Sequence, residues 1–190
     1  MGLLINHTFK WAYIHIPKTG GTTITEILLR VPDTEHIMSH GTLNELKNMD
    51  DYFIFTFVRN PYTRLASWYD HIKRDTKTQP FSNFIKSIQD LDYLHFPQTY
   101  FIKHGETPTK QVSFIGKYET FNTDLEFILN RINVNVNEIP HLNKNPMWDV
   151  HPNLNSEKLY KFYYTENWMG EWVKEKYKDD FTFFNYGLDI

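Results

Sequence analysis

The sequence predicts an α/β fold in which a small central parallel β-sheet is flanked by helices. Two stretches, 11–16 and 52–58, are nearly continuous runs of apolar, aromatic and β-branched residues, which is typical of strands buried on both faces. Each run is followed by a turn and then by a segment with the apolar spacing of a helix, at 22–29 and 61–72. Two successive strand–turn–helix units favour a parallel sheet, because a helix is the usual connection between parallel strands.

A glycine loop lies between the first strand and the first helix. Pro17 ends the strand, because proline has no N–H to donate to a sheet ladder. Gly20 and Gly21 follow, and they let the backbone approach a ligand without a Cβ in the way. Thr23 and Glu26 form a Thr-x-x-Glu capping pattern, which predicts the start of the helix. Unpaired N–H groups and the positive end of the helix dipole would then meet at one spot, which suits a phosphate or a sulfate.

Cationic and hydroxyl side chains accompany this loop. Lys18 supplies a positive charge, and His15 is expected to brace the loop from the preceding strand. In the usual nucleotide-triphosphate loop, G-x-x-x-x-G-K-[ST], the lysine follows the glycines, whereas here it precedes them and the loop is shorter. Taken alone, the loop has an alternative interpretation as an ordinary tight turn with a surface lysine. Hydroxyl donors to an anion are expected from Thr19, Thr22 and Thr23.

A second group of candidate residues follows the second strand. Arg59 stands at the carboxyl end of that strand, where open α/β sheets bind ligands. An arginine suits a phosphate because its planar fork binds two oxygens at once. Asn60 as N-cap and Pro61 at the first helical position predict the start of the next helix. One stripe of that helix carries Arg64, Ser67 and His71.

The segment between the two units carries a candidate general base. Thr42 and Glu45 form another capping pattern, so a short helix is expected to start at Thr42. His40 precedes this helix on a loop, beside the permissive Gly41. An unperturbed histidine pKa of about 6.5 fits general-base work close to neutral pH.

Weaker patterns complete the chain. Residues 113–118 are expected to form a strand, and the capping pattern at 123–126 is expected to open a helix. The apolar spacing over residues 156–178 predicts one or two amphipathic helices, broken near Thr165 and Gly170.

Composition limits the class of protein. The chain of 190 residues shows no repeat or convincing linker, so a single domain over 1–190 is expected. It has no cysteine, which excludes disulfides, cysteine nucleophiles and thiolate metal sites. A net charge of -3 argues against a general nucleic-acid binder. The sequence contains no long apolar run and no secretory signal, so no membrane association is expected and a cytoplasmic protein of bacterial or viral origin is predicted.

The two motifs together resemble those of a known enzyme family. Pro-Lys-Thr-Gly-Gly-Thr-Thr at 17–23 resembles the phosphosulfate-binding loop of sulfotransferases that use 3'-phosphoadenosine 5'-phosphosulfate (PAPS). Arg-Asn-Pro-x-x-Arg-x-x-Ser-x-Tyr at 59–69 resembles their second motif. Later blocks at 96–100, 114–119 and 139–144 extend the resemblance to the carbohydrate-type sulfotransferases over nearly the whole chain. This resemblance implies a P-loop-like three-layer fold.

The resemblance also implies roles for individual residues. PAPS would be the donor co-substrate, and no metal would be needed. Lys18 and residues 19–23 are implied to hold the phosphosulfate, and Arg59 and Ser67 its 3'-phosphate. Lys144 is implied to lie on a loop that closes over the nucleotide. The reaction would be an in-line displacement that moves the sulfuryl group to an acceptor hydroxyl, on a saccharide in the carbohydrate type.

The identity of the base stays open among several residues. Lys18 would neutralise charge on the transferring group, and His40 is implied as the base because some relatives have a histidine in a similar His-Gly context. Other relatives use a glutamate, which leaves Glu26 and Glu45 as alternatives. Weaker candidates are His71 and His141.

Two other functions remain as alternatives. A kinase-like phosphotransferase of the P-loop class would need a magnesium-binding acid at the end of a strand, and neither core strand ends that way. A nucleotide- or glycan-binding module would keep the pocket without turnover. Gln98 is expected on the acceptor side of the site, while the acceptor and the oligomeric state are not predicted.

Overall fold

The described residues form two compact units. The computed structural model describes residues 2–38, 41–73, 79–88, 95–103, 112–136 and 160–189. One unit comprises Met1–Arg59 with Gln98–Leu142, and the other comprises Asn60–Pro97 with Asn143–Ile190. The expectation of a single domain over 1–190 stays a prediction.

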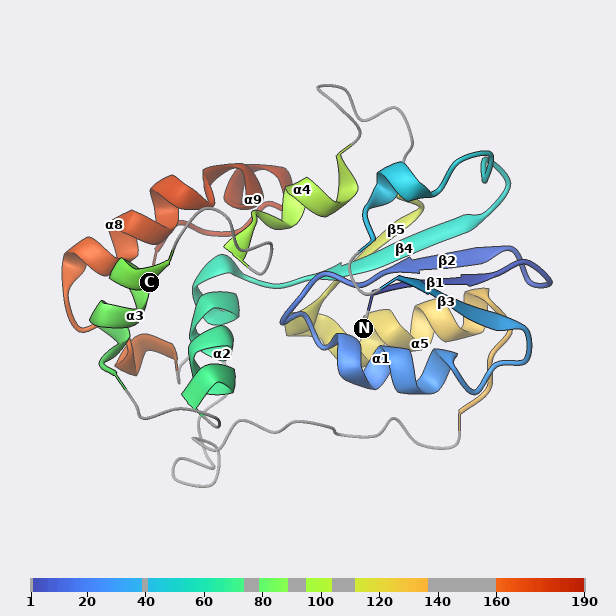
Figure 1. Cartoon of the computed structure of the whole chain (residues 1–190), viewed down its shortest axis with the longest axis horizontal. Coiled ribbons are helices and arrows are strands. Elements are labelled where there is room, and N and C mark those ends of the chain that lie inside the picture. The colour runs from blue at the N-terminus through green and yellow to red at the C-terminus, as the bar shows by residue number, and fades with distance from the viewer. Residues whose placement is uncertain are drawn as a thin grey trace. The chain divides into compact units, whose positions relative to one another are not determined.

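The first unit is built on a five-stranded sheet with the strand order β3-β1-β2-β4-β5 (Figure 1). Strands β2, β4 and β5 pair in parallel, and β1 is antiparallel to both of its neighbours, so four of the five strands run in one direction. The predicted α/β class with a central, mostly parallel sheet is confirmed. The strands are β1 (Leu3–Asn6), β2 (Trp11–Ile14), β3 (Thr34–Met38), β4 (Phe53–Val58) and β5 (Phe114–Lys117).

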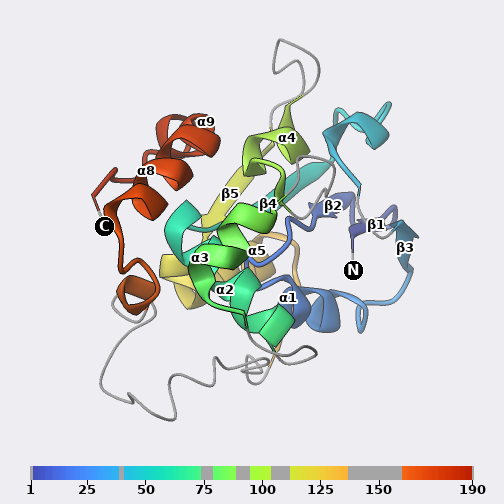
Figure 2. The ribbon, with the colours of Figure 1, turned by 60° about the vertical axis from the view of Figure 1, so that its left-hand side comes forward.

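Both faces of the sheet are buried, which explains the continuous apolar runs of its central strands. Helices α1 (Gly21–Leu28) and α5 (Phe121–Arg131) lie on the same side of the sheet in both views (Figures 1 and 2). On that face, Trp11 and Phe55 share a hydrophobic cluster with Ile24 of α1. Full burial of one such side chain contributes about 1.5–3 kcal/mol. The opposite face carries Ala12, Ile14, Ile54 and Val58, and these are buried as well.

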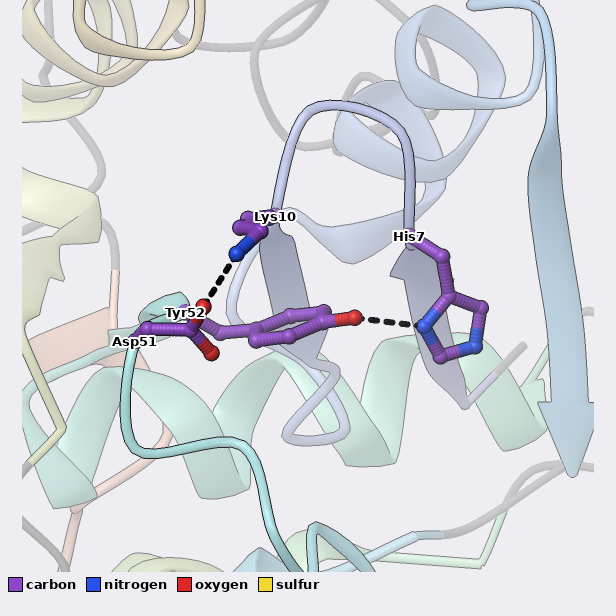
Figure 3. Close-up of polar contacts among 4 residues, drawn as sticks. All are labelled: His7, Lys10, Asp51 and Tyr52. Atoms are coloured by element: carbon purple, nitrogen blue, oxygen red, sulfur yellow. Dashed lines mark hydrogen bonds and ion pairs between the residues drawn. The ribbon is translucent and has the colours of Figure 1, made fainter.

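Polar contacts join β2 to β4 where the two strands begin. Lys10 forms an ion pair with Asp51, and His7 Nδ1 lies 2.6 Å from the hydroxyl of Tyr52 (Figure 3). The N–H of Phe53 donates to the carbonyl of Lys10 at 2.9 Å. The strands pair in the register Trp11 to Phe53, so the contacts lie at the end of the sheet away from the carboxyl ends of β2 and β4.

Aromatic residues hold the second unit together. The Tyr62 hydroxyl donates to the carbonyl of Leu188 at 2.8 Å, and the Tyr164 hydroxyl donates to the carbonyl of Tyr62 at 2.9 Å. The predicted N-cap at Asn60 is confirmed for the helix that begins at Pro61, because the side chain of Asn60 accepts from the Tyr62 N–H at 2.9 Å. The predicted break near Gly170 is wrong, since that residue lies inside a helix. The elements are α2 (Pro61–Lys73), α3 (Phe81–Ser87), η4 (Tyr160–Phe162), α8 (Asn167–Lys176) and α9 (Lys178–Phe183).

Short elements complete the first unit. They are η1 (Leu43–Glu45), α4 (Gln98–Ile102) and η3 (Tyr118–Thr120). The capping box predicted for η1 is confirmed, because the Glu45 carboxylate accepts from the N–H of Thr42 at 2.6 Å while the Thr42 hydroxyl accepts from the Asn44 N–H. None of the helices among the described residues is long and apolar enough to cross a membrane.

Two predicted capping boxes are wrong. Helix α1 begins at Gly21 with Gly20 as its N-cap, and Glu26 instead forms an ion pair with Arg30 at 2.5 Å. Helix α5 begins at Phe121, two residues before the predicted box at 123–126. The N-cap residues are Gly20 for α1 and Thr120 for α5, and neither makes a side-chain capping hydrogen bond.

Candidate active site

The loop between β2 and α1 turns through two residues in the left-handed region. Lys18 has φ 70° and Gly20 has φ 89°. A side chain disfavours this conformation by about 1–2 kcal/mol, so Lys18 is held there by its surroundings. The fully buried hydroxyl of Thr19 donates to the carbonyl of Ile16 at 2.8 Å. Because a hydroxyl has one proton to donate, this side chain shapes the loop rather than donating to an anion.

The glycines of the loop are fixed by close packing. A Cβ on Gly21 would stand 2.0 Å from His15 Nε2, and a Cβ on Gly20 would stand 2.7 Å from a ring carbon of Phe121. His15 is buried and stacks on Tyr13, with ring centroids 5.9 Å apart. His15 therefore lies against the loop, as predicted, and occupies the space that a larger residue at 21 would need.

The N-terminus of α1 has the features of an anion-binding end. The helix is eight residues long, and its N-cap residue, Gly20, has no side chain to cap the first amides. Its first turn contains no acidic residue. The N–H groups of the first turn lack partners within the helix, and together with the helix dipole they attract negative charge.

Arg59 lies beside this loop at the carboxyl end of β4. Its side chain is 7% exposed, and its guanidinium carbon lies 4.0 Å from the centre of the Tyr118 ring. Nη1 of Arg59 donates to the carbonyl of Lys18 at 3.4 Å. The structure therefore brings together two cationic residues, Lys18 and Arg59, that are 41 positions apart in the sequence.

Three residues surround Arg59, of which Tyr118 and Asp124 were not assigned a role in the site from sequence. Gln98 bonds the backbone of Arg59 with both ends of its side-chain amide, and its expected place on the acceptor side stays a prediction. Tyr118 supplies the ring under the guanidinium. The Asp124 carboxylate accepts from the Lys117 N–H and from the Thr120 hydroxyl, both at 2.7 Å, and so fixes the turn that carries Tyr118.

Other predicted site residues lie elsewhere or beyond the described part of the chain. Ser67 is partly buried on α2, in the second unit, whereas Arg59 belongs to the first. His71, also on α2, is exposed, with its ring 5.7 Å from that of Trp68. The carboxylate of Glu45 contacts both the N–H and the hydroxyl of Thr42. Outside the described residues lie His40, Lys144 and His141.

Comparison with known proteins identifies the family. The sequence profile of the sulfotransferase family matches residues 1–187, which is nearly the whole chain. The chain belongs to the sulfotransferase family. This sulfotransferase is 34% identical over 88 residues to an uncharacterized protein of Archaeoglobus fulgidus, a match that covers 45% of this chain and 72% of that protein. No solved structure matches this sulfotransferase chain of 190 residues.

Family membership confirms the resemblance read from the two motifs. It assigns the sulfotransferase to the transfer of sulfuryl groups, the chemistry that defines the family. In the described ranges of the sulfotransferase, no three or more of the residue types His, Cys, Asp and Glu gather in a group that could hold a metal ion.

Proposed function

We propose that the protein transfers a sulfuryl group from PAPS to an acceptor hydroxyl of a saccharide. One observation carries the donor assignment. The guanidinium of Arg59 reaches the carbonyl of Lys18, so an arginine and an anion-binding loop meet at the carboxyl ends of two neighbouring parallel strands. A nucleotide with phosphate groups at both its 3' and 5' positions needs two such cationic groups close together.

The described residues fit the two anionic ends of PAPS. The 5'-phosphosulfate would be held by the first-turn amides of α1, the backbone of the loop and the Lys18 ammonium. A Cβ at Gly20 or Gly21 would clash with neighbouring side chains, so the loop that presents those amides needs glycine at both positions. Arg59, a planar donor already oriented by Tyr118, would hold the 3'-phosphate. By the family resemblance, Ser67 and Lys144 complete the proposed donor site.

The chemistry then needs a base and a neutralising charge. PAPS, when bound, would supply the sulfuryl group, and the bond from sulfur to the 5'-phosphate would break to release 3'-phosphoadenosine 5'-phosphate. His40 would take the proton of the attacking hydroxyl, and Lys18 would neutralise the charge that develops on the transferring group. Positioning and electrostatics would supply most of the rate, as in phosphoryl transfer. The saccharide is proposed because the motifs resemble those of the carbohydrate-type enzymes.

Calorimetric titration with 3'-phosphoadenosine 5'-phosphate (PAP) tests the donor site. Wild type should bind PAP at micromolar concentration without metal, and more tightly than it binds ADP. Arg59→Ala should weaken PAP by about tenfold or more, because a charge-assisted bond contributes about 1.5–3 kcal/mol. ADP should be nearly unaffected by this substitution, whereas Lys18→Ala should weaken both nucleotides.

Arg30→Ala is the matched control for the loss of a positive charge. The Arg30 side chain is 68% exposed just after the end of α1, where it pairs with Glu26, so its removal should leave PAP affinity unchanged. Tighter binding of ATP with magnesium than of PAP, together with no effect of Arg59→Ala, would contradict the proposal and favour a kinase-like phosphotransferase.

A further inference from the structure

The side chain of Gln98 is hydrogen-bonded to both backbone groups of Arg59. Gln98 Nε2 donates to the carbonyl of Arg59 at 2.8 Å, and the N–H of Arg59 donates to Gln98 Oε1 at 2.8 Å. Gln98 is the first residue of α4 and is 0% exposed. One fully buried side chain, 39 positions away in the sequence, therefore satisfies both backbone groups of the residue that follows β4.

This contact replaces a missing strand partner. The ladder between β4 and β5 ends at the pair Val58 and Lys117, so the backbone of Arg59 lies beyond the regular pairing of the sheet. Arg59 is nearly buried, and buried backbone groups need hydrogen-bond partners. The amide of Gln98 presents a donor and an acceptor as a neighbouring strand would. It thereby fixes the direction in which the Arg59 side chain leaves the sheet.

The far end of the Arg59 side chain is held as well. Its guanidinium lies over the Tyr118 ring and reaches the carbonyl of Lys18. The turn that carries Tyr118 is itself fixed by Asp124. A free arginine side chain has many rotamers. Because the Arg59 side chain is held at both ends before the ligand arrives, it loses less conformational entropy on binding than a free side chain would.

We propose that Gln98 is a positioning residue for the anion site of Arg59. By orienting the backbone of Arg59, it sets the preference of the site for adenine nucleotides that carry a 3'-phosphate. This inference rests on the proposed function, in which Arg59 binds that phosphate. Gln98 itself touches no reacting atom in this scheme, and its effect passes entirely through Arg59.

The test compares two buried amides at opposite ends of the sheet. Gln98→Met keeps the length of the side chain and removes both hydrogen bonds. Asn6→Leu is the matched control, because Asn6 is also 0% exposed, donates to the carbonyl of Pro32 and accepts from the N–H of Phe9, both at 2.8 Å. Both substitutions should lower the melting temperature, since each leaves buried backbone groups unpaired.

The readout that separates positioning from stability is the ratio of the Kd for ADP to the Kd for PAP. Gln98→Met should lower this ratio by about tenfold, whereas Asn6→Leu should leave it at the wild-type value. If Gln98→Met does not fold, Gln98→Asn carries the test. Its amide is one methylene shorter and cannot reach both groups, so the ratio should again fall.

Two negative outcomes are distinguishable. If wild type prefers PAP and Gln98→Met keeps that preference, Gln98 is only structural and the inference is overturned while the proposed function stands. If wild type shows no preference for PAP over ADP, the proposed function fails and the inference fails with it.

Discussion

The imidazole of His15 occupies the place where a side chain at Gly21 would stand, because a Cβ on Gly21 would lie 2.0 Å from His15 Nε2. The two residues lie on either side of the anion loop, His15 just after β2 and Gly21 at the start of α1. The backbone of Gly21 is not in the left-handed region. The need for glycine at this position is therefore a matter of space.

A double-mutant cycle tests this explanation. Gly21→Ala should lower the free energy of unfolding by about 1–3 kcal/mol or more, because the added methyl group must displace the ring. His15→Ala removes the obstacle, so the double variant should be more stable than Gly21→Ala alone. Chemical denaturation should give a favourable coupling energy of about 1 kcal/mol or more. Additive effects of the two substitutions would contradict the explanation.

Gly20 provides the contrasting control. A Cβ there would meet Phe121 at 2.7 Å, but Gly20 also has φ 89°. Gly20→Ala should therefore stay destabilising when it is combined with Phe121→Ala, because removing the ring does not relieve the backbone strain.

The backbone conformation of Lys18 is expected to lower the free energy of unfolding, while its ammonium group should contribute to nucleotide binding. Its φ of 70° is unfavourable for any residue with a Cβ, so Lys18→Gly relieves strain while Lys18→Ala keeps it. Lys18→Gly should be more stable than Lys18→Ala by about 1 kcal/mol in chemical denaturation. Both variants lose the ammonium group, so both should bind PAP more weakly than wild type. Equal stability of the two variants would show that the loop relaxes without strain.

The most readily predicted part of the fold is the pair of strands β2 and β4. They stand out in the sequence because a central strand covered on two sides must be apolar at nearly every position. Strand β5 was also predicted, although it lies at the edge of the sheet and is mostly half-buried, whereas the fully buried β1 was not predicted. Among the described strands, β3 (Thr34–Met38) pairs with β1 and lies at the edge of the sheet, and its sequence Thr-Glu-His-Ile-Met shows neither alternation nor a long apolar run. No strand is predicted at this place, because the Pro32-Asp33 turn signal precedes it and the sequence carries no strand pattern.

The same distinction holds in the candidate site. The loop with Lys18 and the position of Arg59 follow from local order in the chain, since each comes directly after a strand. Tyr118 and Gln98 act on Arg59 from segments far away in sequence, and nothing in the neighbouring residues indicates that contact. Helix α1 begins at Gly21, two residues before the predicted cap at Thr23, so the Thr-x-x-Glu pattern does not mark its start.

The hydroxyl of Tyr13 should lower the free energy of unfolding. This hydroxyl is buried in the core and finds no hydrogen-bond partner in the described part of the chain. Tyr13→Phe should therefore raise the free energy of unfolding at pH 7 by about 1 kcal/mol. Tyr62→Phe is the control, because the Tyr62 hydroxyl donates to the carbonyl of Leu188. It should lower the free energy of unfolding by about 1 kcal/mol.

The two tyrosines should also make the protein sensitive to alkali. Burial raises the pKa of Tyr62 to about 12, and burial raises the pKa of Tyr13 well above its ordinary value. A tyrosine in the unfolded chain ionises at about pH 10, so from there up to the folded pKa the unfolded state binds fewer protons than the folded state. The free energy of unfolding should then fall by about 1.4 kcal/mol per pH unit for each tyrosine. Urea denaturation can measure this between pH 9 and pH 11, about one unit either side of the ordinary tyrosine pKa. The free energy of unfolding should fall less steeply with pH in each Tyr→Phe variant than in wild type.

Substitution of Glu45 should affect mainly the free energy of unfolding, whereas substitution of His40 should affect mainly the turnover rate. The Glu45 carboxylate is engaged by the N–H and the hydroxyl of Thr42, so its expected role is to cap η1. Glu45→Gln keeps an acceptor and should retain turnover, with a loss of about 0.5–1 kcal/mol in the free energy of unfolding. His40→Ala should lose turnover by about 100-fold or more while it binds PAP as wild type does, because general-base catalysis contributes about that factor. Steady-state sulfation of a saccharide acceptor measures the rate, and calorimetry measures PAP affinity. The opposite pattern, with turnover lost in Glu45→Gln and kept in His40→Ala, would make Glu45 the base and the capping box secondary.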